Sequence, residues 1–393
     1  MRILHQCGHN AVWNRTSFTE RGDGDGLILS PVHERISQVE SYDPEIKRSA
    51  LFDPQFYLPN SQKNKLQEYE FFPDVVAQGF QTSTFEVRAL DAARQCIDFQ
   101  LEQEFERVVI PARFFGQMVT DYCQRQEAYS VVPHLTALGE RNGHDRPIYL
   151  TLPVTTHMVS DQGYRMELLN WATSYPEIDG IYLIVSDDRN TKQVCNGDVM
   201  FEILSFVREL RLSGLKVLVG YCNSESLLFS LIKGVEVTFG AYENTRIFSI
   251  DKFVVSDDDQ RGPRARIYLD GLHNWVQLEQ AREIRDSAPE VWQEIYRPTE
   301  DSEEALSSPT PWHFGKSQLY MHHFSNMQAA VNELGTLSPL QAHAALRSKL
   351  RNADRFYSEI DDALIDLERH GKGEHIQGWL SAINRFAREH LRD

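Results

Sequence analysis

Short, almost entirely apolar runs recur along the first two thirds of the chain, separated by segments long enough to hold a helix. Val108–Ile110, Ile181–Val185 and Val217–Val219 contain no charged side chain. A parallel strand that is covered on both faces has this composition, whereas a half-exposed antiparallel strand alternates between apolar and polar residues. The pattern therefore predicts a mostly parallel sheet built from repeated strand–helix units.

The number of apolar runs indicates which α/β architecture the chain adopts. Eight strands within about 245 residues fit a (β/α)8 TIM-like barrel, and an open doubly wound sheet is the competing α/β architecture. Apolar residues at helical spacing predict helices over Glu86–Glu104, over Val199–Leu212 with a stop at Gly214, and over Ser224–Ile232 with a Ser cap. The predicted strands are Leu27–Val32, Ala50–Phe52, Arg107–Ile110, Pro147–Leu152, Ile181–Val185, Lys216–Tyr221, Val235–Phe239 and Arg266–Leu269.

Three regions follow from the changes in composition. Residues 1–285 are assigned to the barrel, with 59–84 as a long loop over its mouth. Residues 286–313, which are acidic and rich in Ser and Pro, are assigned to a linker. Residues 314–393 form a C-terminal helical extension, in which Ser338-Pro339 starts a helix. Its apolar stripe packs either on its own barrel or on a protein partner, and it consists of Leu346, Leu350, Phe356, Ile360, Leu364 and Leu367.

The charge balance limits the class of partner. Forty Lys and Arg against 57 Asp and Glu give a net charge of −17. This excludes an autonomous binder of nucleic acid backbone, which needs a cationic face, but it leaves room for a local basic cleft. The apolar runs are too short for a membrane helix, and the N-terminus turns polar too early for a signal peptide. We therefore expect a cytoplasmic protein without a membrane partner.

Polar side chains follow most of the predicted strands, where the loops of a βα barrel form its active site. Carboxylates at strand ends suit proton transfer, so Asp53 and Asp270 are the expected catalytic residues. Arg113, next to a Phe, suits an anionic or planar ligand. The expected substrate-binding residues are His33, Gln55, Tyr57, Arg113, Phe115, Asp187, Asn223, Tyr242, Arg246 and His273.

Several of these residues also have structural interpretations. Asp53 before Pro54 can cap a turn, and Asp187 can cap the segment that follows it. Arg113 can form an ion pair at the barrel rim, and Asp270 can belong to a tight turn.

The sequence gives no sign of a metal or cofactor site. The five cysteines lie far apart, and His33, His157 and His273 occur in different loops without ligand spacing. The three glycines Gly22, Gly24 and Gly26 precede a strand and alternate with Asp, which would repel phosphate, so they predict a turn. We therefore expect neither a metal nor a cofactor.

One segment resembles a known family. Lys233–Gly240, followed by Thr245-Arg246, is similar to the seventh-strand region of the tRNA-guanine transglycosylases. The resemblance covers about a dozen residues and implies a (β/α)8 barrel that exchanges a guanine base in nucleic acid. Gly240 stands where that family has its nucleophilic aspartate, and the zinc-binding cysteine signature is missing. No catalytic role is therefore transferred from it.

Two classes of function remain open. In the first, the chain is a barrel enzyme that acts on a nucleobase-like or nucleic-acid-linked substrate by base exchange or glycosidic-bond chemistry, or an enzyme that hydrolyses a phosphate or glycosidic bond with the same carboxylates. In the second, it is a non-catalytic barrel subunit of a multi-protein assembly, bound through its C-terminal helices. Convergence of Asp53, Arg113 and Asp270 in one pocket would favour the enzyme.

Overall fold

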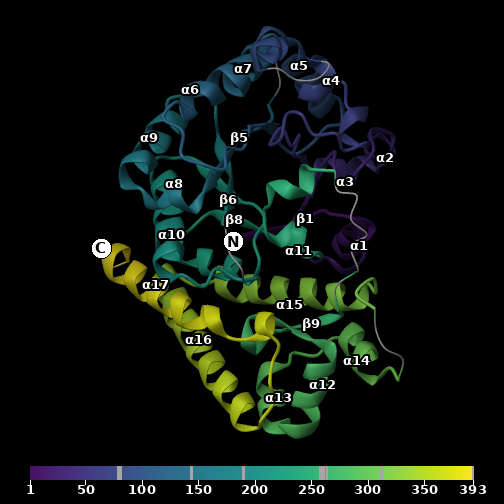
Figure 1. Ribbon diagram of the computed structural model, residues 1–393, viewed down its shortest axis with the longest axis vertical. Helices are drawn as coiled ribbons and strands as arrows, with labels where there is room; N and C mark the ends of the chain where they lie inside the picture. Colours follow the sequence, from purple (N-terminus) through teal and green to yellow (C-terminus); the bar gives the residue numbers. More distant parts are fainter. Residues whose placement is uncertain are drawn as a thin grey trace.

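The computed structural model contains eight parallel strands arranged as a barrel (Figure 1). It describes residues 1–77, 82–141, 145–187, 191–255, 262, 264–309 and 313–391. The strands are β1 (Arg2–Gln6), β2 (Leu27–Leu29), β3 (Ala50–Phe52), β4 (Val108–Ile110), β5 (Ile148–Thr155), β6 (Gly180–Ser186), β7 (Lys216–Val219) and β8 (Val235–Gly240).

The strands follow one another around the barrel in chain order. β1 pairs with both β2 and β8, which joins the first strand to the last. Between β3 and β4 the pairing is reduced to one parallel bridge, from Leu51 to Arg107, and a hydrogen bond from the Glu106 amide to the Ala50 carbonyl. The barrel is therefore nearly closed, and the predicted TIM-like α/β fold is confirmed.

The number of barrel strands was right, but one barrel strand was missed and one predicted strand was assigned to the wrong sheet. β1 lies at the very start of the chain, where only two apolar residues, Ile3 and Leu4, are adjacent. The run predicted as the eighth barrel strand is β9 (Arg266–Leu269), which pairs antiparallel with β10 (Asn274–Gln277) outside the barrel. Both errors arise because a short apolar run does not reveal its pairing partner.

Side chains on β1 and on β4 to β7 alternate between two packed layers, whereas those of β2 and β3 all belong to one of them. Leu4, Val109, Tyr149, Tyr182 and Leu218 belong to one buried cluster, and their strand neighbours belong to a second cluster that packs against the surrounding helices. Because successive side chains point to opposite faces of a strand, the first set fills the barrel and the second covers its outside.

The amino-terminal end of the barrel is closed by charged residues. Arg107, which is 3% exposed, forms an ion pair with Glu236 of β8 and bonds to Glu106 at 3.1 Å. Arg2 bonds to both glutamates, at 2.9 and 3.0 Å. Burial alone would lower the pKa of Arg107, but the bonds to Glu236 raise it above its usual value. The charge of this buried guanidinium is thus matched within the barrel.

Helices connect the strands on the outside of the barrel. The predicted helices at 86–104 and 199–212 are present as α5 (Thr82–Glu102) and α10 (Gly197–Leu212), and Gly214 has the expected left-handed conformation. The other connecting helices are α1 (Val12–Thr16), η1 (Ser17–Arg21), α2 (Ile36–Glu40), α3 (Pro44–Arg48), η2 (Leu66–Glu68), α4 (Pro73–Ala77), α6 (Tyr122–Gln126), η3 (Glu127–Val131), α7 (Val132–Gly139), α8 (Thr156–Ser160), α9 (Gln162–Ala172) and η4 (Ser224–Leu231).

Two of these connections differ from the prediction. Within 59–84, expected to be a loop, the chain forms η2, α4 and the start of α5, and residues 78–81 lie outside the described part. η4 is a 3-10 helix rather than an α-helix, and its Ncap, Asn223, makes no side-chain cap bond.

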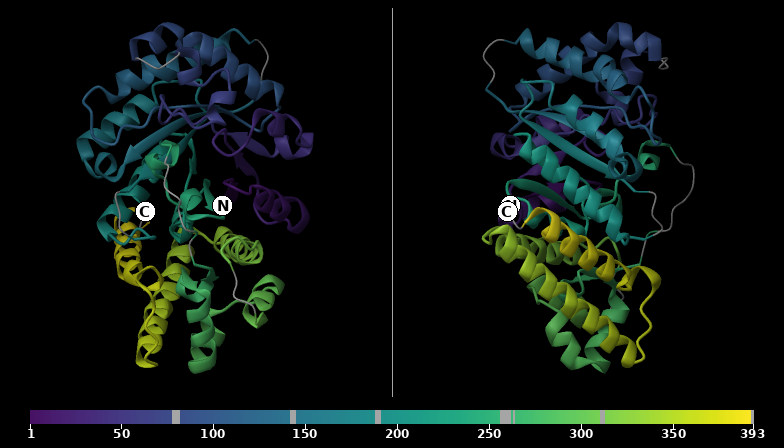
Figure 2. Two further views of the ribbon diagram at one scale, coloured as in Figure 1. Left: turned by 45° about the vertical axis from the view of Figure 1, so that its right-hand side comes forward. Right: turned by 90° about the vertical axis from the view of Figure 1, so that its left-hand side faces the viewer.

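The C-terminal residues form a helical lobe below the barrel, shown in green to yellow in Figure 2. After α11 (Glu243–Arg246) and η5 (Ile250–Phe253) come β9, η6 (Asp270–Leu272), β10 and α12 (Leu278–Ser287). The predicted acidic linker instead contains α13 (Pro289–Ile295) and α14 (Glu300–Ser307), whose apolar faces are buried. The last elements are α15 (Gln318–Gly335), α16 (Pro339–Asp362), η7 (Arg369–Gly371) and α17 (Glu374–His390).

The C-terminal helices pack on the chain's own barrel. Phe324 of α15 contacts the rings of His5 on β1 and Phe239 on β8, and α17 lies against α10. Of the predicted apolar stripe, every member is at most 4% exposed except Leu364, which is 91% exposed. α16 starts at the predicted Ser338 cap. No helix of the described chain has both the length and the apolar character needed to cross a bilayer.

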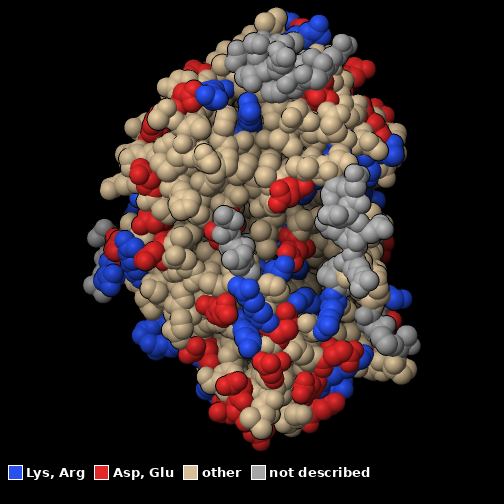
Figure 3. Space-filling view, viewed as in Figure 1, with Lys and Arg blue, Asp and Glu red and all other residues tan. Residues whose placement is uncertain are grey.

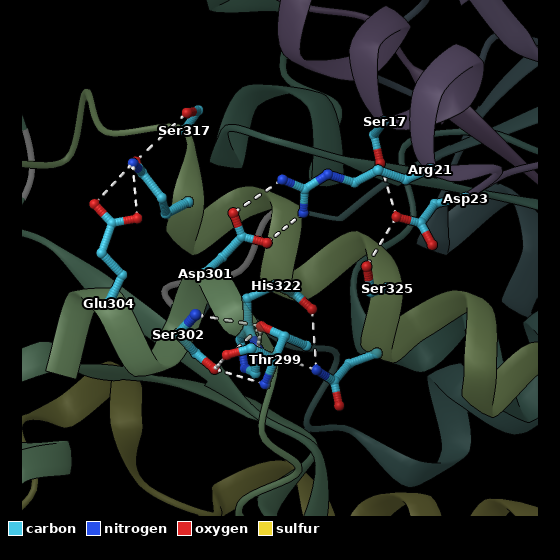
Figure 4. Close-up of polar contacts among 12 residues, drawn as sticks. Ser17, Arg21, Asp23, Thr299, Asp301, Ser302, Glu304, Ser317, His322 and Ser325 are labelled. Atoms are coloured by element: carbon cyan, nitrogen blue, oxygen red, sulfur yellow. Dashed lines mark hydrogen bonds and ion pairs between the residues drawn. The ribbon is translucent and has the colours of Figure 1, made fainter. Parts of the chain in front are cut away.

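Polar contacts also join the lobe to the first connection of the barrel (Figure 4). Arg21 binds the Asp301 carboxylate of α14 with both terminal nitrogens. Asp23 accepts hydrogen bonds from Ser17 at 3.0 Å and from Ser325 of α15 at 2.9 Å. Since Asp23 is largely buried, these bonds orient α15 against the barrel.

The ion pair inside the barrel gives a stability prediction. Replacing Glu236 by Leu leaves Arg107 buried without its main partner, which we expect to cost about 3–5 kcal/mol of unfolding free energy. The double variant Arg107→Met/Glu236→Leu should recover most of that loss in urea denaturation. Glu104→Gln, in an exposed pair with Arg48, serves as the control and should cost under about 1 kcal/mol. A double variant as unstable as the single one would contradict the interpretation.

Candidate functional site

A buried carboxylate lies at the carboxyl end of β3. Asp53 is fully buried, and its Oδ1 accepts hydrogen bonds from the Gln55 backbone amide and the Tyr57 hydroxyl, both at 3.0 Å. The Tyr57 hydroxyl also lies 2.9 Å from Oδ2. Asp53 is therefore held in place by hydrogen bonds from two residues that follow it in the same loop, Gln55 and Tyr57.

A lysine from the segment after β8 joins this loop. The Lys252 ammonium lies 2.9 Å from the Tyr221 hydroxyl, and the Gln55 side-chain amide donates to the same hydroxyl at 3.2 Å. Tyr221 follows β7 and is 4% exposed, so the ammonium reaches a buried position although Lys252 as a residue is only half-buried. Tyr221 therefore links the Asp53 loop to Lys252.

The two charged groups shift each other's titration. Burial raises the pKa of Asp53 to about 7, while the bonds from Tyr57 and Gln55 and the charge of Lys252 oppose the rise. Burial lowers the pKa of Lys252 to about 7, opposed by Asp53. Burial therefore weakens the preference of both groups for the charged state, which is the direction expected of groups that exchange protons.

The backbone at this site is held in an uncommon conformation. Gln55 has φ 58° and Tyr221 has φ 54°, the left-handed region that side chains other than glycine rarely adopt. Asn10, at the rim after β1, has φ 59°. Such backbone persists where the surrounding structure fixes it, and it concentrates at functional sites.

Aromatic rings cover the site. Phe248 and Phe253 lie 5.2 and 5.5 Å from the Tyr57 ring, and Phe248 also packs on Tyr221 and Phe114. A small cavity of about 40 Å³ reaches Tyr221 from the side of β6 and β7. This volume holds water but no substrate.

The predicted residues after β2 and β4 lie at the rim. The pKa of His33 is held well below its usual value by burial and by nearby lysines, including Lys252, and its Nε2 is buried without a partner. Arg113 lies over the ring of Phe115, at 5.2 Å, and its backbone is fixed by the Gln126 side chain. This stacking is made within the loop itself, and the ligand contact expected of Arg113 stays a prediction.

The predicted residues after β6, β7 and β8 occupy the opposite side. Asp187 lines the small cavity beside Tyr221. Asn223 donates to the Lys192 carbonyl at 3.0 Å. The Tyr242 hydroxyl accepts a bond from Asn10 at 3.1 Å, and Arg246 lies over Trp275 of the C-terminal lobe, at 4.1 Å.

Asp270 and His273 do not belong to this group. They were expected at the end of an eighth barrel strand, but Asp270 starts η6 after β9, and His273 lies between η6 and β10. The physical reason is the antiparallel pairing of β9, which removes both residues from the barrel. Asp53, Arg113 and Asp270 therefore do not converge in one pocket.

Sequence reasoning missed Lys252, Gln6 and Tyr182. Lys252 lies beyond the last strand in a short 3-10 turn without periodicity. Gln6 ends the unpredicted β1 and accepts a bond from the Tyr182 hydroxyl at 3.1 Å. Tyr182 sits at an inward position of β6, and recognition of its strand parity would have placed it inside the barrel.

No group of His, Cys, Asp and Glu among the described residues could hold a metal ion. Comparison with protein-family models, with curated proteins and with solved structures found no match to the chain. The site is therefore interpreted from its own geometry.

The titration of Asp53 predicts a pH-dependent stability. The unfolded carboxyl loses its proton near 3.8, but the folded one keeps it to about 7, so unfolding free energy should fall as pH rises through that interval. Asp53→Asn keeps the Oδ1 acceptor and should lack this fall, which amounts to up to roughly 1.4 kcal/mol per pH unit. Urea denaturation between pH 4 and 8 measures it. Parallel pH profiles of the two proteins would refute the shifted carboxyl.

The Asp53→Asn variant should also change the pKa of Lys252. Because the Asp53 carboxylate raises the pKa of Lys252, Asp53→Asn should lower it further below about 7. Side-chain NMR of ¹³C-labelled lysine reports the titration, with Lys252→Met identifying the signal. Exposed Lys216 is the internal control and should not change. A Lys252 signal that titrates as an ordinary lysine would contradict the site.

Proposed function

We propose that the chain is a barrel enzyme in which Asp53, Lys252 and Tyr221 transfer protons to and from a small polar substrate. The observation that supports this is the buried carboxylate–lysine pair at the carboxyl end of the strands, where barrel enzymes have their active sites. Asp53 and Lys252 form no direct ion pair among the described residues. A pair with a purely structural role would be in direct contact, as Arg107 and Glu236 are.

Each residue has a distinct role in the proposed chemistry. The uncharged Lys252 amine takes a proton from the substrate, and the protonated Asp53 carboxyl supplies the balancing proton to another atom of the substrate. The Tyr221 hydroxyl accepts bonds from both Lys252 and Gln55, which leaves its own proton to be donated to the substrate. Binding of substrate requires displacement of the Phe248 and Phe253 rings.

For the substrate we retain a planar, nucleobase-like compound, free or linked to nucleic acid. The stacking surfaces at the mouth, Phe248, Phe114 and Phe115, support a planar group. The Gln55 amide, in contrast, already bonds to Val32 and Tyr221, so base-edge recognition would fall to other groups. Base exchange remains the reaction proposed from the family resemblance.

The test combines ligand identification with variants. Native mass spectrometry of gently purified protein should reveal a bound base, nucleoside or nucleotide. NMR of the protein with a nucleoside panel in D₂O should show proton exchange or glycosidic cleavage. Asp53→Asn, Lys252→Met and Tyr221→Phe should each lower the rate at least about 100-fold with the fold retained, whereas Lys216→Met should not.

The pH profile of that activity distinguishes the pair from a single base. If one proton is shared between Asp53 and Lys252, kcat/KM should be bell-shaped, with its maximum near pH 7. Lys252→Met should remove the acidic limb of the profile, in which the rate falls because the amine becomes protonated. A rate that is flat between pH 5 and 9 would contradict proton transfer by this pair.

A second candidate is a non-catalytic barrel that serves as a subunit of an assembly. The complete burial of Asp53 beneath the aromatic cover favours it. In that case the purified protein carries no small molecule, co-purifies with other polypeptides, and Asp53→Asn leaves that association unchanged.

A further inference from the structure

A second buried charge lies where the barrel meets the C-terminal lobe. Arg246, at the end of α11, is 8% exposed. Its Nε and Nη1 are buried and have no hydrogen-bond partner, and no carboxylate in the described chain forms an ion pair with it. Its guanidinium carbon lies 4.1 Å from the centre of the Trp275 ring.

Two neighbouring side chains share this lack of partners. The indole Nε1 of Trp275 is buried and unbonded, and so are both ring nitrogens of His323. These residues are 5% and 1% exposed, and their rings lie 4.6 Å apart. The three groups come from α11, β10 and α15, so three elements from the barrel and the lobe bring their unpaired groups together.

The chemistry of these groups indicates what is missing. A guanidinium and an indole can only donate hydrogen bonds, and a neutral imidazole carries one N–H donor. Burial lowers the pKa of Arg246 to about 10, which still leaves it charged at neutral pH. A buried cation without a partner destabilises the folded state, so proteins pair such groups or use them to hold an anion.

The surface charge agrees with an anion at this position. Although the net charge is −17, several Lys and Arg side chains gather near the boundary between barrel and lobe on the face shown in Figure 3. Asp and Glu are prominent over the lower lobe in the same view. These cationic side chains, which lie among Asp and Glu in the same view, reduce the repulsion that an anion meets elsewhere on the acidic surface.

We propose that Arg246, Trp275 and His323 form a binding site for an oxyanion, carried by a phosphate or by the carboxylate of a small molecule. The guanidinium binds the oxyanion through the nitrogens that lack partners, and the indole and imidazole N–H groups bind its remaining oxygens. The site follows β8 and adjoins the barrel mouth, so it would hold the charged end of a ligand. It does not depend on the proton-transfer role of Asp53.

The first test measures anion binding directly. In phosphate-free buffer, added sodium phosphate should raise the thermal unfolding midpoint by roughly 2 °C for each tenfold of concentration above Kd. Sodium acetate at equal ionic strength distinguishes the sources: a response to phosphate alone assigns a phosphate site, and a response to acetate alone assigns a carboxylate site. No response to either anion would overturn the proposal.

Variants then assign the response to these residues. Arg246→Met keeps an apolar stem against Trp275 but removes the charge, so the response should be lost while the midpoint in phosphate-free buffer rises. Trp275→Phe keeps the ring and removes the N–H, and should weaken binding roughly tenfold. The exposed Arg347→Met should bind as the unmodified protein does. A retained response in Arg246→Met, or a midpoint lowered without phosphate, would overturn the proposal.

Discussion

The cost of burying charge governs the interior of this barrel. Eight parallel strands enclose a space that side chains must fill, and charged side chains lie at both of its ends. At the amino-terminal end, Arg107 is surrounded by Glu236 and Glu106, so its charge is matched at hydrogen-bonding distance. This arrangement closes one end of the barrel and accounts for the charged residues on β8 and just before β4, which their apolar surroundings would otherwise exclude.

The carboxyl end shows the opposite arrangement. Asp53 and Lys252 are buried near each other without direct contact, and both lose part of their preference for the charged state. Arg246 stays charged and forms no direct ion pair among the described residues, although Glu243 and Glu225 lie near enough to raise its pKa against the effect of burial. Groups that cost free energy in the folded state without compensation are retained for function, which is why these two positions carry the proposals.

The barrel could be predicted from the sequence because each strand–helix unit has a recognisable pattern of apolar residues within its own segment. An apolar run covered on both faces, followed by a helix with one apolar face, needs no knowledge of the rest of the chain. The closure of the barrel is different, since pairing of β1 with β8 joins residues more than 200 positions apart. Nothing local in Arg2–Gln6 distinguishes it from a loop, and nothing local in Arg266–Leu269 reveals an antiparallel partner.

The same distinction explains which site residues could be predicted. Asp53, Gln55 and Tyr57 follow an apolar run directly, and the rule that sites lie at strand ends holds whatever number the strand has. Asp270 met the same local rule and was placed wrongly, because its strand pairs elsewhere. Lys252 does not directly follow an apolar run, so no sequence pattern marked it. It contacts Tyr221 because the segment after β8 folds back over the barrel end. The position of a loop after a strand therefore points to one half of the proposed acid–base pair, and only the tertiary structure identifies the other half.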